Sequence, residues 1–199
     1  MLAIRRAPAP AAQRGVLRAK TRFMTWTASI LSEPPVSGSV SERVFDSRVP
    51  GGSWLWVSFR DLVNGESWAA SFRRRFDAPD AVHLVFATDD AVVIAGAEAY
   101  WISLAEQAMR YHEPNVFQAV PIPSRAMVAA SDFTTVSLLA PEGVVWRSPR
   151  ISLDGLSFTE VTADVVKGEA EDSSGHVPFE VELGSRVVRG GMRSWQGAK

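Results

Sequence analysis

Short apolar runs separated by turn residues dominate the chain from residue 53 onward. The runs 54–59 and 68–72 flank Asn64-Gly65, and 82–87 and 91–95 flank the polar triplet 88–90. An Asn-Gly pair between two such runs strongly indicates a β-hairpin, because both residue types tolerate positive φ. The pattern therefore predicts antiparallel strands joined by tight turns.

The same spacing continues toward the C-terminus, where β-compatible segments recur every 8–12 residues, a spacing typical of sandwiches, barrels and propellers. Nothing in the pattern indicates the long crossovers of a parallel sheet. The further predicted strands are 98–102, 126–130, 134–140, 144–146, 158–161, 165–170, 177–183 and 186–188.

These elements predict an all-β fold of two packed antiparallel sheets, arranged as a sandwich or in a propeller-like manner. The sheets would come from two strand-rich blocks, 53–102 and 126–188, within a single domain over 25–199. The connector 103–125 holds the one helix candidate, 103–112, whose apolar residues recur at helical spacing before Pro114 ends it.

The chain begins with a basic segment. Residues 1–22 carry six Arg and Lys residues and no acid, and Pro8 and Pro10 interrupt any helix. This composition predicts a disordered basic tail over 1–24, with a transit peptide or translated sequence before Met24 as alternatives. The unbroken apolar run of a secretory signal is absent from it. The other residues then carry a net charge of −7, which disfavours sequence-independent binding of nucleic acid.

Composition narrows the chemistry further. Hydrophobic residues make up 46% and charged residues 22% of the chain, as in ordinary globular proteins. The sequence has no Cys, which excludes disulfides, Cys-ligated metal centres and thiol nucleophiles, and which fits a reducing cytoplasm. No apolar run reaches the roughly 20 residues of a membrane-spanning helix, so we expect no membrane partner.

A histidine-based site would have to use His83, His112 or His176. His112 is the best placed, because Tyr111 and Glu113 beside it supply further titratable groups in an irregular connector, and loops often carry function. The three histidines lack the spacing of metal ligands, and the phosphate-binding and nucleophile-elbow motifs are absent. We therefore assign no catalytic residue, metal or cofactor from the sequence.

The aromatic residues offer a second kind of candidate site. Trp54 and Trp56 are two residues apart, so they lie on one face of their strand. Two such indoles form either a stacking platform for a sugar, base or Pro-rich peptide, or part of the core. We take Trp54, Trp56 and Trp101, with Tyr111, His112 and Glu113, as candidate ligand-binding residues.

The C-terminal region contains two further recognisable elements, residues 145–156 (VWRSPRISLDGL) and residues 178–183 (PFEVEL). This Trp-x-Ser…Ser-x-Asp-Gly element followed by a Pro-Phe-x-Val-x-Leu strand resembles a pattern in uncharacterised bacterial β-rich proteins, and it is similar to β-propeller blades. The resemblance implies a blade-like sheet, and it implies no catalytic residue.

Three functional hypotheses follow. The first is a non-catalytic β-scaffold that binds a protein partner, favoured because no acid, base and nucleophile set is recognisable in the sequence. The second is a hydrolase-type enzyme with a site near the 103–125 connector. The third is a carbohydrate or small-molecule binder that uses exposed Trp residues. The sequence leaves the partner and the oligomeric state open.

Overall fold

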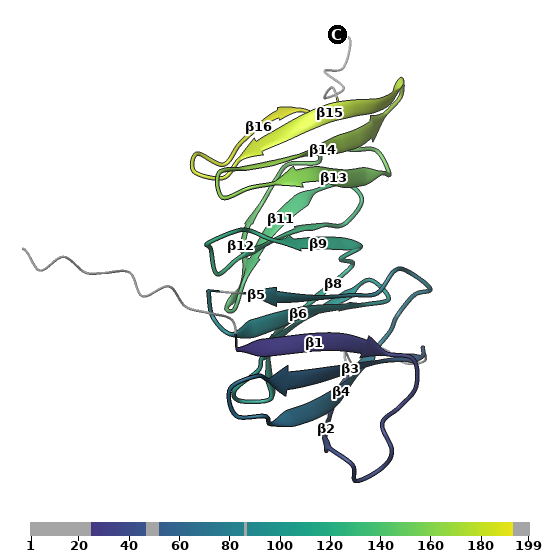
Figure 1. Cartoon of the computed structure of the whole chain (residues 1–199). Helices are drawn as coiled ribbons and strands as arrows, with labels where there is room; N and C mark the ends of the chain where they lie inside the picture. Colours follow the sequence, from purple (N-terminus) through teal and green to yellow (C-terminus); the bar gives the residue numbers. More distant parts are fainter. Residues whose placement is uncertain (1–24, 47–51, 86, 193–199) are drawn as a thin grey trace, which may run out of the picture.

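The computed structural model describes residues 25–46, 52–85 and 87–192, which form sixteen strands in four four-stranded sheets (Figure 1). The predicted basic tail lies outside the described residues. The first sheet has β1 (Trp26–Leu31), β2 (Ser41–Phe45), β3 (Trp54–Asp61) and β4 (Ser67–Arg73). The second has β5 (Ala81–Val85), β6 (Asp90–Ala95), β7 (Glu98–Ser103) and β8 (Ala108–Pro114). The third has β9 (Gln118–Pro121), β10 (Val128–Ser131), β11 (Val136–Ala140) and β12 (Gly143–Arg147). The fourth has β13 (Leu156–Val161), β14 (Val165–Asp172), β15 (Gly175–Glu182) and β16 (Val187–Gly190).

The sheets follow one another in chain order and stack face to face, with the first and fourth at opposite ends (Figure 1). Their first strands, β1, β5, β9 and β13, lie next to one another along the stack. The second, third and fourth sheets are antiparallel meanders of four consecutive strands. The prediction of an all-β, propeller-like fold is confirmed, with four sheets where the sequence led us to expect two.

Three hydrophobic cores hold the stack together, one between each pair of neighbouring sheets. The first contains Phe59, Phe72 and Tyr100, the second Trp101 and Leu139, and the third residues of sheets three and four. The two inner sheets are thus covered on both faces, which is why β6 and β7 are buried along their whole length. In contrast, β3 alternates between buried and more exposed positions, because only one of its faces meets a core.

The predicted hairpin around Asn64-Gly65 is confirmed. Strands β3 and β4 pair antiparallel, with Phe59 opposite Trp68. Gly65 has a φ of +72° in the turn, and the Asp61 carboxylate accepts hydrogen bonds from the backbone N–H of Val63 and the side-chain amide of Asn64, both at 2.8 Å. The Asp61 carboxylate therefore holds the turn through one backbone N–H and one side-chain amide.

The first sheet departs from the meander of the others. Strand β2 precedes β3 in the chain but forms the far edge of the sheet, where it pairs parallel with β4. The connection from β1 to β2 therefore passes from one edge of the sheet to the other.

The helix predicted over 103–112 is wrong. A turn follows β7, and Gln107 has a φ of +50°, which ends any helical path. Residues from Ala108 onward then pair with β7 as strand β8. The connector 103–125 is thus mostly strand, and the described ranges include no helix that meets the length and hydropathy needed to cross a bilayer.

Candidate functional site

Trp54 and Trp56 lie on the face of β3 that points away from the first core. Their neighbours Leu55 and Val57 are buried in that core, and a strand alternates its side chains between two faces. Trp54 is 36% exposed and Trp56 is half-buried. The structure thus places both indoles on the outer surface of the first sheet.

Cross-strand pairing extends this surface over all four strands of the first sheet. Leu31 of β1 lies opposite Trp56, Ser71 of β4 lies on its other side, and Val44 of β2 lies opposite Ser71. Val44 is 65% exposed, whereas the small Ser71 is buried between its larger neighbours. We call the surface formed by Leu31, Val44, Trp54, Trp56, Arg60 and Arg73 the indole face.

Arginines border the indole face. The Arg73 guanidinium lies over the Trp54 ring at 4.2 Å from its centroid, and its Nε is 3.5 Å from the Asp46 carboxylate. Arg60, farther along β3, is exposed. A guanidinium over an indole is a cation–π contact, which holds both groups in place without removing the exposed ring from solvent.

The sequence analysis missed the contribution of Arg73. In the hairpin register, Arg73 lies directly opposite Trp54. Because the Asn64-Gly65 turn fixes which residues of the two strands face each other, counting outward from it is the signal that identifies this pair.

Trp101 belongs to the interior. It is 2% exposed in the second core, and its indole N–H donates a 2.9 Å hydrogen bond to the carboxylate of buried Asp90. Arg110 lies 3.5 Å from the other oxygen of that carboxylate. The buried ring cannot stack on a ligand in this position, and its indole N–H is already hydrogen-bonded to Asp90.

Tyr111, His112 and Glu113 do not converge on one site. They are consecutive residues of β8, so Tyr111 and Glu113 lie on the face toward the third sheet and His112 on the opposite face. The His112 ring packs against Tyr100 of the first core, with centroids 5.0 Å apart, whereas Tyr111 packs against the second core.

The Tyr111 hydroxyl donates a hydrogen bond to Glu113, and the same carboxylate accepts a 2.6 Å hydrogen bond from Arg147 of β12. Burial, followed by the hydrogen bond and the negative charge of Glu113, raises the pKa of Tyr111 to about 12, although Arg147 acts in the opposite direction. Tyr111 is therefore a poor proton donor near neutral pH, and the Glu113–Arg147 ion pair links the second and third sheets.

The Nε2 atom of His112 is in hydrogen-bond contact with the carboxylate of Glu98 at the start of β7. Glu98 is fully buried, and the Arg75 guanidinium lies 3.6 Å from its other oxygen. This cluster gives a buried carboxylate two basic partners, and it requires no bound ligand to explain it.

The other histidines lie apart from these clusters. His83 is on β5, where burial lowers its pKa below 6.5, and His176 is exposed on β15. Across the part of the chain that the structure describes, no three His, Asp or Glu residues form a group able to hold a metal ion.

Comparisons with known proteins bear on the fold. No family model and no curated protein matches the chain. Among solved structures, dihydro-heme d1 dehydrogenase NirN in complex with DHE aligns with 69% of this chain at a TM-score of 0.50 and 15% identity. A chain of the mitotic checkpoint complex aligns with 95% of it at a TM-score of 0.48 and 9% identity. This chain covers 34% and 60% of those two chains. The first similarity supports a propeller-like β fold, and at this identity it says nothing about activity.

Proposed function

We propose that the chain is a non-catalytic β-scaffold that binds another protein through the indole face. The observation that carries the proposal is the difference between the two ends of the stack. Every sheet face that meets a neighbouring sheet is covered by a core, whereas the indole face leaves Trp54 36% exposed and Trp56 half-buried. Adjacent exposed apolar side chains that form one patch, here Trp54 and Val44 with Trp56 between them, are a feature of interaction sites.

The opposite end of the stack has a different surface. The outer face of the fourth sheet carries charged side chains joined by ion pairs, including Lys167 to Glu160 at 3.0 Å and Arg189 to Glu180 at 3.5 Å. The indole face also carries charges, Arg60 and the Arg73–Asp46 ion pair, but it differs in presenting Trp54 beside them, which favours it as the surface for a partner.

The chemistry of the indole face defines the partner surface that fits it. Trp and Arg are the residues most enriched among those that dominate binding energy at interfaces. Here Trp54 and Trp56 supply apolar area, and Arg60 and Arg73 lie at its borders. The complementary surface is a polypeptide with apolar side chains flanked by Asp or Glu.

The hydrolase hypothesis required Tyr111, His112 and Glu113 to act together. Because β8 directs His112 and the other two residues toward different cores, we do not carry this hypothesis further. Trp101 is likewise enclosed, which leaves Trp54 and Trp56 as the exposed aromatic candidates of the sequence analysis.

The experiment that tests the proposal uses a photo-crosslinking amino acid at position 31 on the indole face, with position 157 on β13 as the matched control. A protein crosslinked only from position 31 is then purified, and its affinity is measured for the wild type, for Trp54→Ser with Trp56→Ser, and for Val187→Ser. We expect the double variant to bind at least about tenfold more weakly, because interface Trp residues often contribute about 2 kcal/mol or more each.

Val187 is exposed on the fourth sheet, so its substitution should leave the affinity unchanged. Equal affinity of the wild type and the double Trp variant would exclude the indole face as the binding surface. A second copy of the chain, crosslinked from position 31 and detected as a concentration-dependent dimer, would replace the hetero-partner with self-association. A strict monomer that crosslinks to nothing would contradict the proposal.

A further inference from the structure

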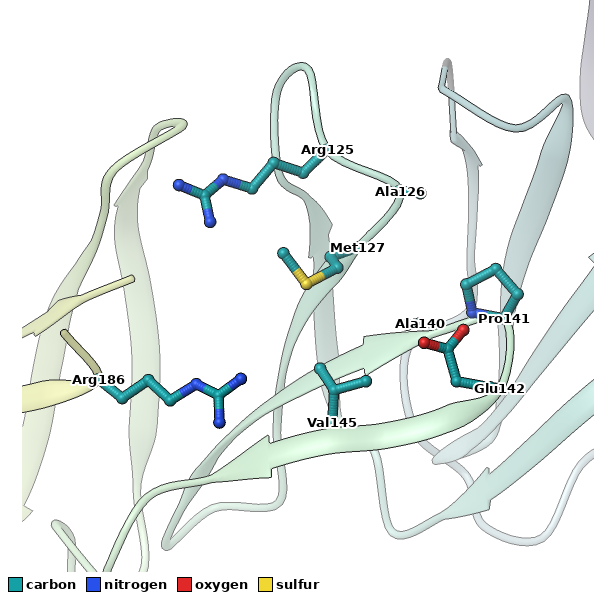
Figure 2. Close-up of a pocket in the computed structure, with 8 residues that line it drawn as sticks. All are labelled: Arg125, Ala126, Met127, Ala140, Pro141, Glu142, Val145 and Arg186. Carbon is teal, nitrogen blue, oxygen red and sulfur yellow. The ribbon is translucent and has the colours of Figure 1, made fainter. Parts of the chain in front are cut away.

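A second surface feature lies between the third and fourth sheets, away from the indole face. A pocket of about 670 Å³ opens there, lined by the β9–β10 loop, the β11–β12 turn and the β15–β16 turn (Figure 2). This volume falls within the range of small-molecule sites. The pocket therefore has room for an organic ligand.

Two guanidinium groups extend into the pocket from different sheets. Arg125 comes from the third sheet and Arg186 from the fourth, and Figure 2 shows both on the same side of the Met127 side chain. The Arg125 guanidinium lies 3.7 Å from the carboxylate of Asp164, whose side chain is 94% exposed. An ion pair of this kind is worth little in water, so it leaves Arg125 able to bind an anion.

The backbone fixes the position of Arg186. Its φ is +60°, and its N–H donates a 2.8 Å hydrogen bond to the carbonyl of Glu182 across the β15–β16 turn. The turn thus fixes the backbone position from which the Arg186 side chain reaches the pocket.

The floor of the pocket is apolar. Met127 and Val145 pack against the third core while their side chains line the pocket, and Pro141 adds to the same surface. The Glu142 carboxylate lies on the other side of Met127 from the two arginines (Figure 2). An anionic group is therefore attracted to the arginine side and repelled from the Glu142 side.

We propose that this pocket binds a small organic anion, whose carboxylate or phosphate lies between Arg125 and Arg186 and whose apolar body rests on Met127 and Val145. Guanidinium groups suit this role because their planar N–H donors match the oxygens of both anions. This site is independent of the proposed protein-binding surface, since the two share no residue.

The test is an NMR titration that follows the Met127 methyl signal in protein labelled at Met methyl groups, with Met109 of β8 as an internal control. The probes are benzoate, phenyl phosphate, inorganic phosphate and benzyl alcohol. We expect benzoate or phenyl phosphate to shift the Met127 signal and not that of Met109. That probe should bind at least about tenfold more tightly than either control compound. Inorganic phosphate lacks the apolar body, and benzyl alcohol lacks the anionic group.

Arg125→Gln and Arg186→Gln should each weaken that binding by about tenfold, the loss expected for one charge-assisted contact. Arg43→Gln, at an exposed arginine of β2 in the first sheet, is the matched control and should bind as the wild type does. The proposal is overturned if neither aromatic anion shifts Met127, if both Gln variants bind like the control, or if inorganic phosphate binds as tightly as phenyl phosphate. The relative affinities of benzoate and phenyl phosphate decide between the two anionic groups.

Discussion

At the scale of single residues, two buried carboxylates explain several of the polar contacts in the second sheet. Asp90 and Glu98 are both almost fully buried, and each lies beside an arginine, Arg110 or Arg75. A buried charge is costly unless it is paired and hydrogen-bonded. Trp101 and His112, which sequence reasoning selected as ligand-binding candidates, are thereby occupied as partners of these two carboxylates.

This pairing predicts the effect of removing one donor. In the Trp101→Phe variant, Asp90 loses the hydrogen bond from the indole N–H, and the smaller ring leaves a cavity. We expect the free energy of unfolding to fall by at least about 1–3 kcal/mol. Urea unfolding monitored by circular dichroism measures this difference. Trp54→Phe, at an exposed position, is the control and should change the value by no more than about 0.5 kcal/mol. Equal stability of the two variants would mean that the Trp101–Asp90 contact contributes nothing.

Tyr111 gives a prediction for the alkaline range. Its pKa rises from 10.0 to about 12 in the folded chain, so folding favours the neutral phenol. The stability from this preference is complete below pH 10 and is lost as the pH rises through about 12. Ultraviolet titration of the wild type minus that of Tyr111→Phe should show a tyrosine transition centred near pH 12. A difference transition near pH 10 would contradict the burial of Tyr111 and its hydrogen bond to Glu113.

At the scale of elements, the structure shows which sequence signals were sufficient. The Asn64-Gly65 hairpin was predictable because local turn chemistry and two flanking β-forming runs agree. The continuous apolar runs of β6 and β7 indicated strands but not that sheets cover both their faces, since that depends on packing between distant segments.

The predicted helix failed for a related reason. Leu104, Ala108 and Tyr111 match a helical period, but such a short segment is also compatible with a turn followed by a strand. Pairing with β7 decides between the two. The same error grouped Tyr111, His112 and Glu113 into one candidate site, because neighbouring residues share a surface in many loops but point to opposite faces in a strand.

The pocket of Arg125 and Arg186 was not predictable from the sequence. These residues lie in turns of two different sheets, and only the stacking of those sheets brings them to one pocket. No spacing in the chain encodes that proximity. The indole face was partly predictable, because Trp54 and Trp56 share a strand and Leu31 and Val44 join them only through pairing.

Gly168 of β14 allows a test of close packing within one element. A Cβ at this position would lie 2.0 Å from the Ser157 carbonyl oxygen and 2.6 Å from the Phe179 ring. We expect Gly168→Ala to lower the free energy of unfolding by about 1–3 kcal/mol, the usual cost of overpacking. Gly184→Ala is the matched control, because a Cβ there would meet no atom within 4 Å. Calorimetric melting of both variants gives the comparison. A Gly168→Ala variant as stable as Gly184→Ala would show that Ser157 and Phe179 shift to accommodate the methyl group without loss of stability.

At the scale of the whole molecule, each sheet packs against its immediate neighbours in the stack. Each of the three cores joins two adjacent sheets, and each inner sheet contributes residues to a core on both of its faces. In such stacks the stability is close to a sum of terms for each sheet and for each interface. The two proposed binding surfaces therefore lie in regions whose local stabilities are separable.

This architecture predicts how a core substitution spreads. Phe72→Ala removes a fully buried ring from the first core, with an expected cost of about 3–5 kcal/mol in that region. Amide hydrogen exchange should then accelerate in β3, β4 and β6, while β14 and β15 keep their protection. Phe179→Ala, in the third core, is the reciprocal variant and should accelerate exchange in the fourth sheet. Uniform acceleration over all sheets in both variants would show that the stack unfolds as one unit.

The position of β2 has a consequence for synthesis on the ribosome. The second, third and fourth sheets are built from consecutive strands, so each strand can pair with the one that emerged just before it. Among the described residues, strand β2 pairs only with β4, which is translated after β3. Residues 41–45 must therefore leave the exit tunnel and wait unpaired until Ser67–Arg73 follows. The outer edge of the first sheet, including Val44 of the indole face, is completed out of translation order.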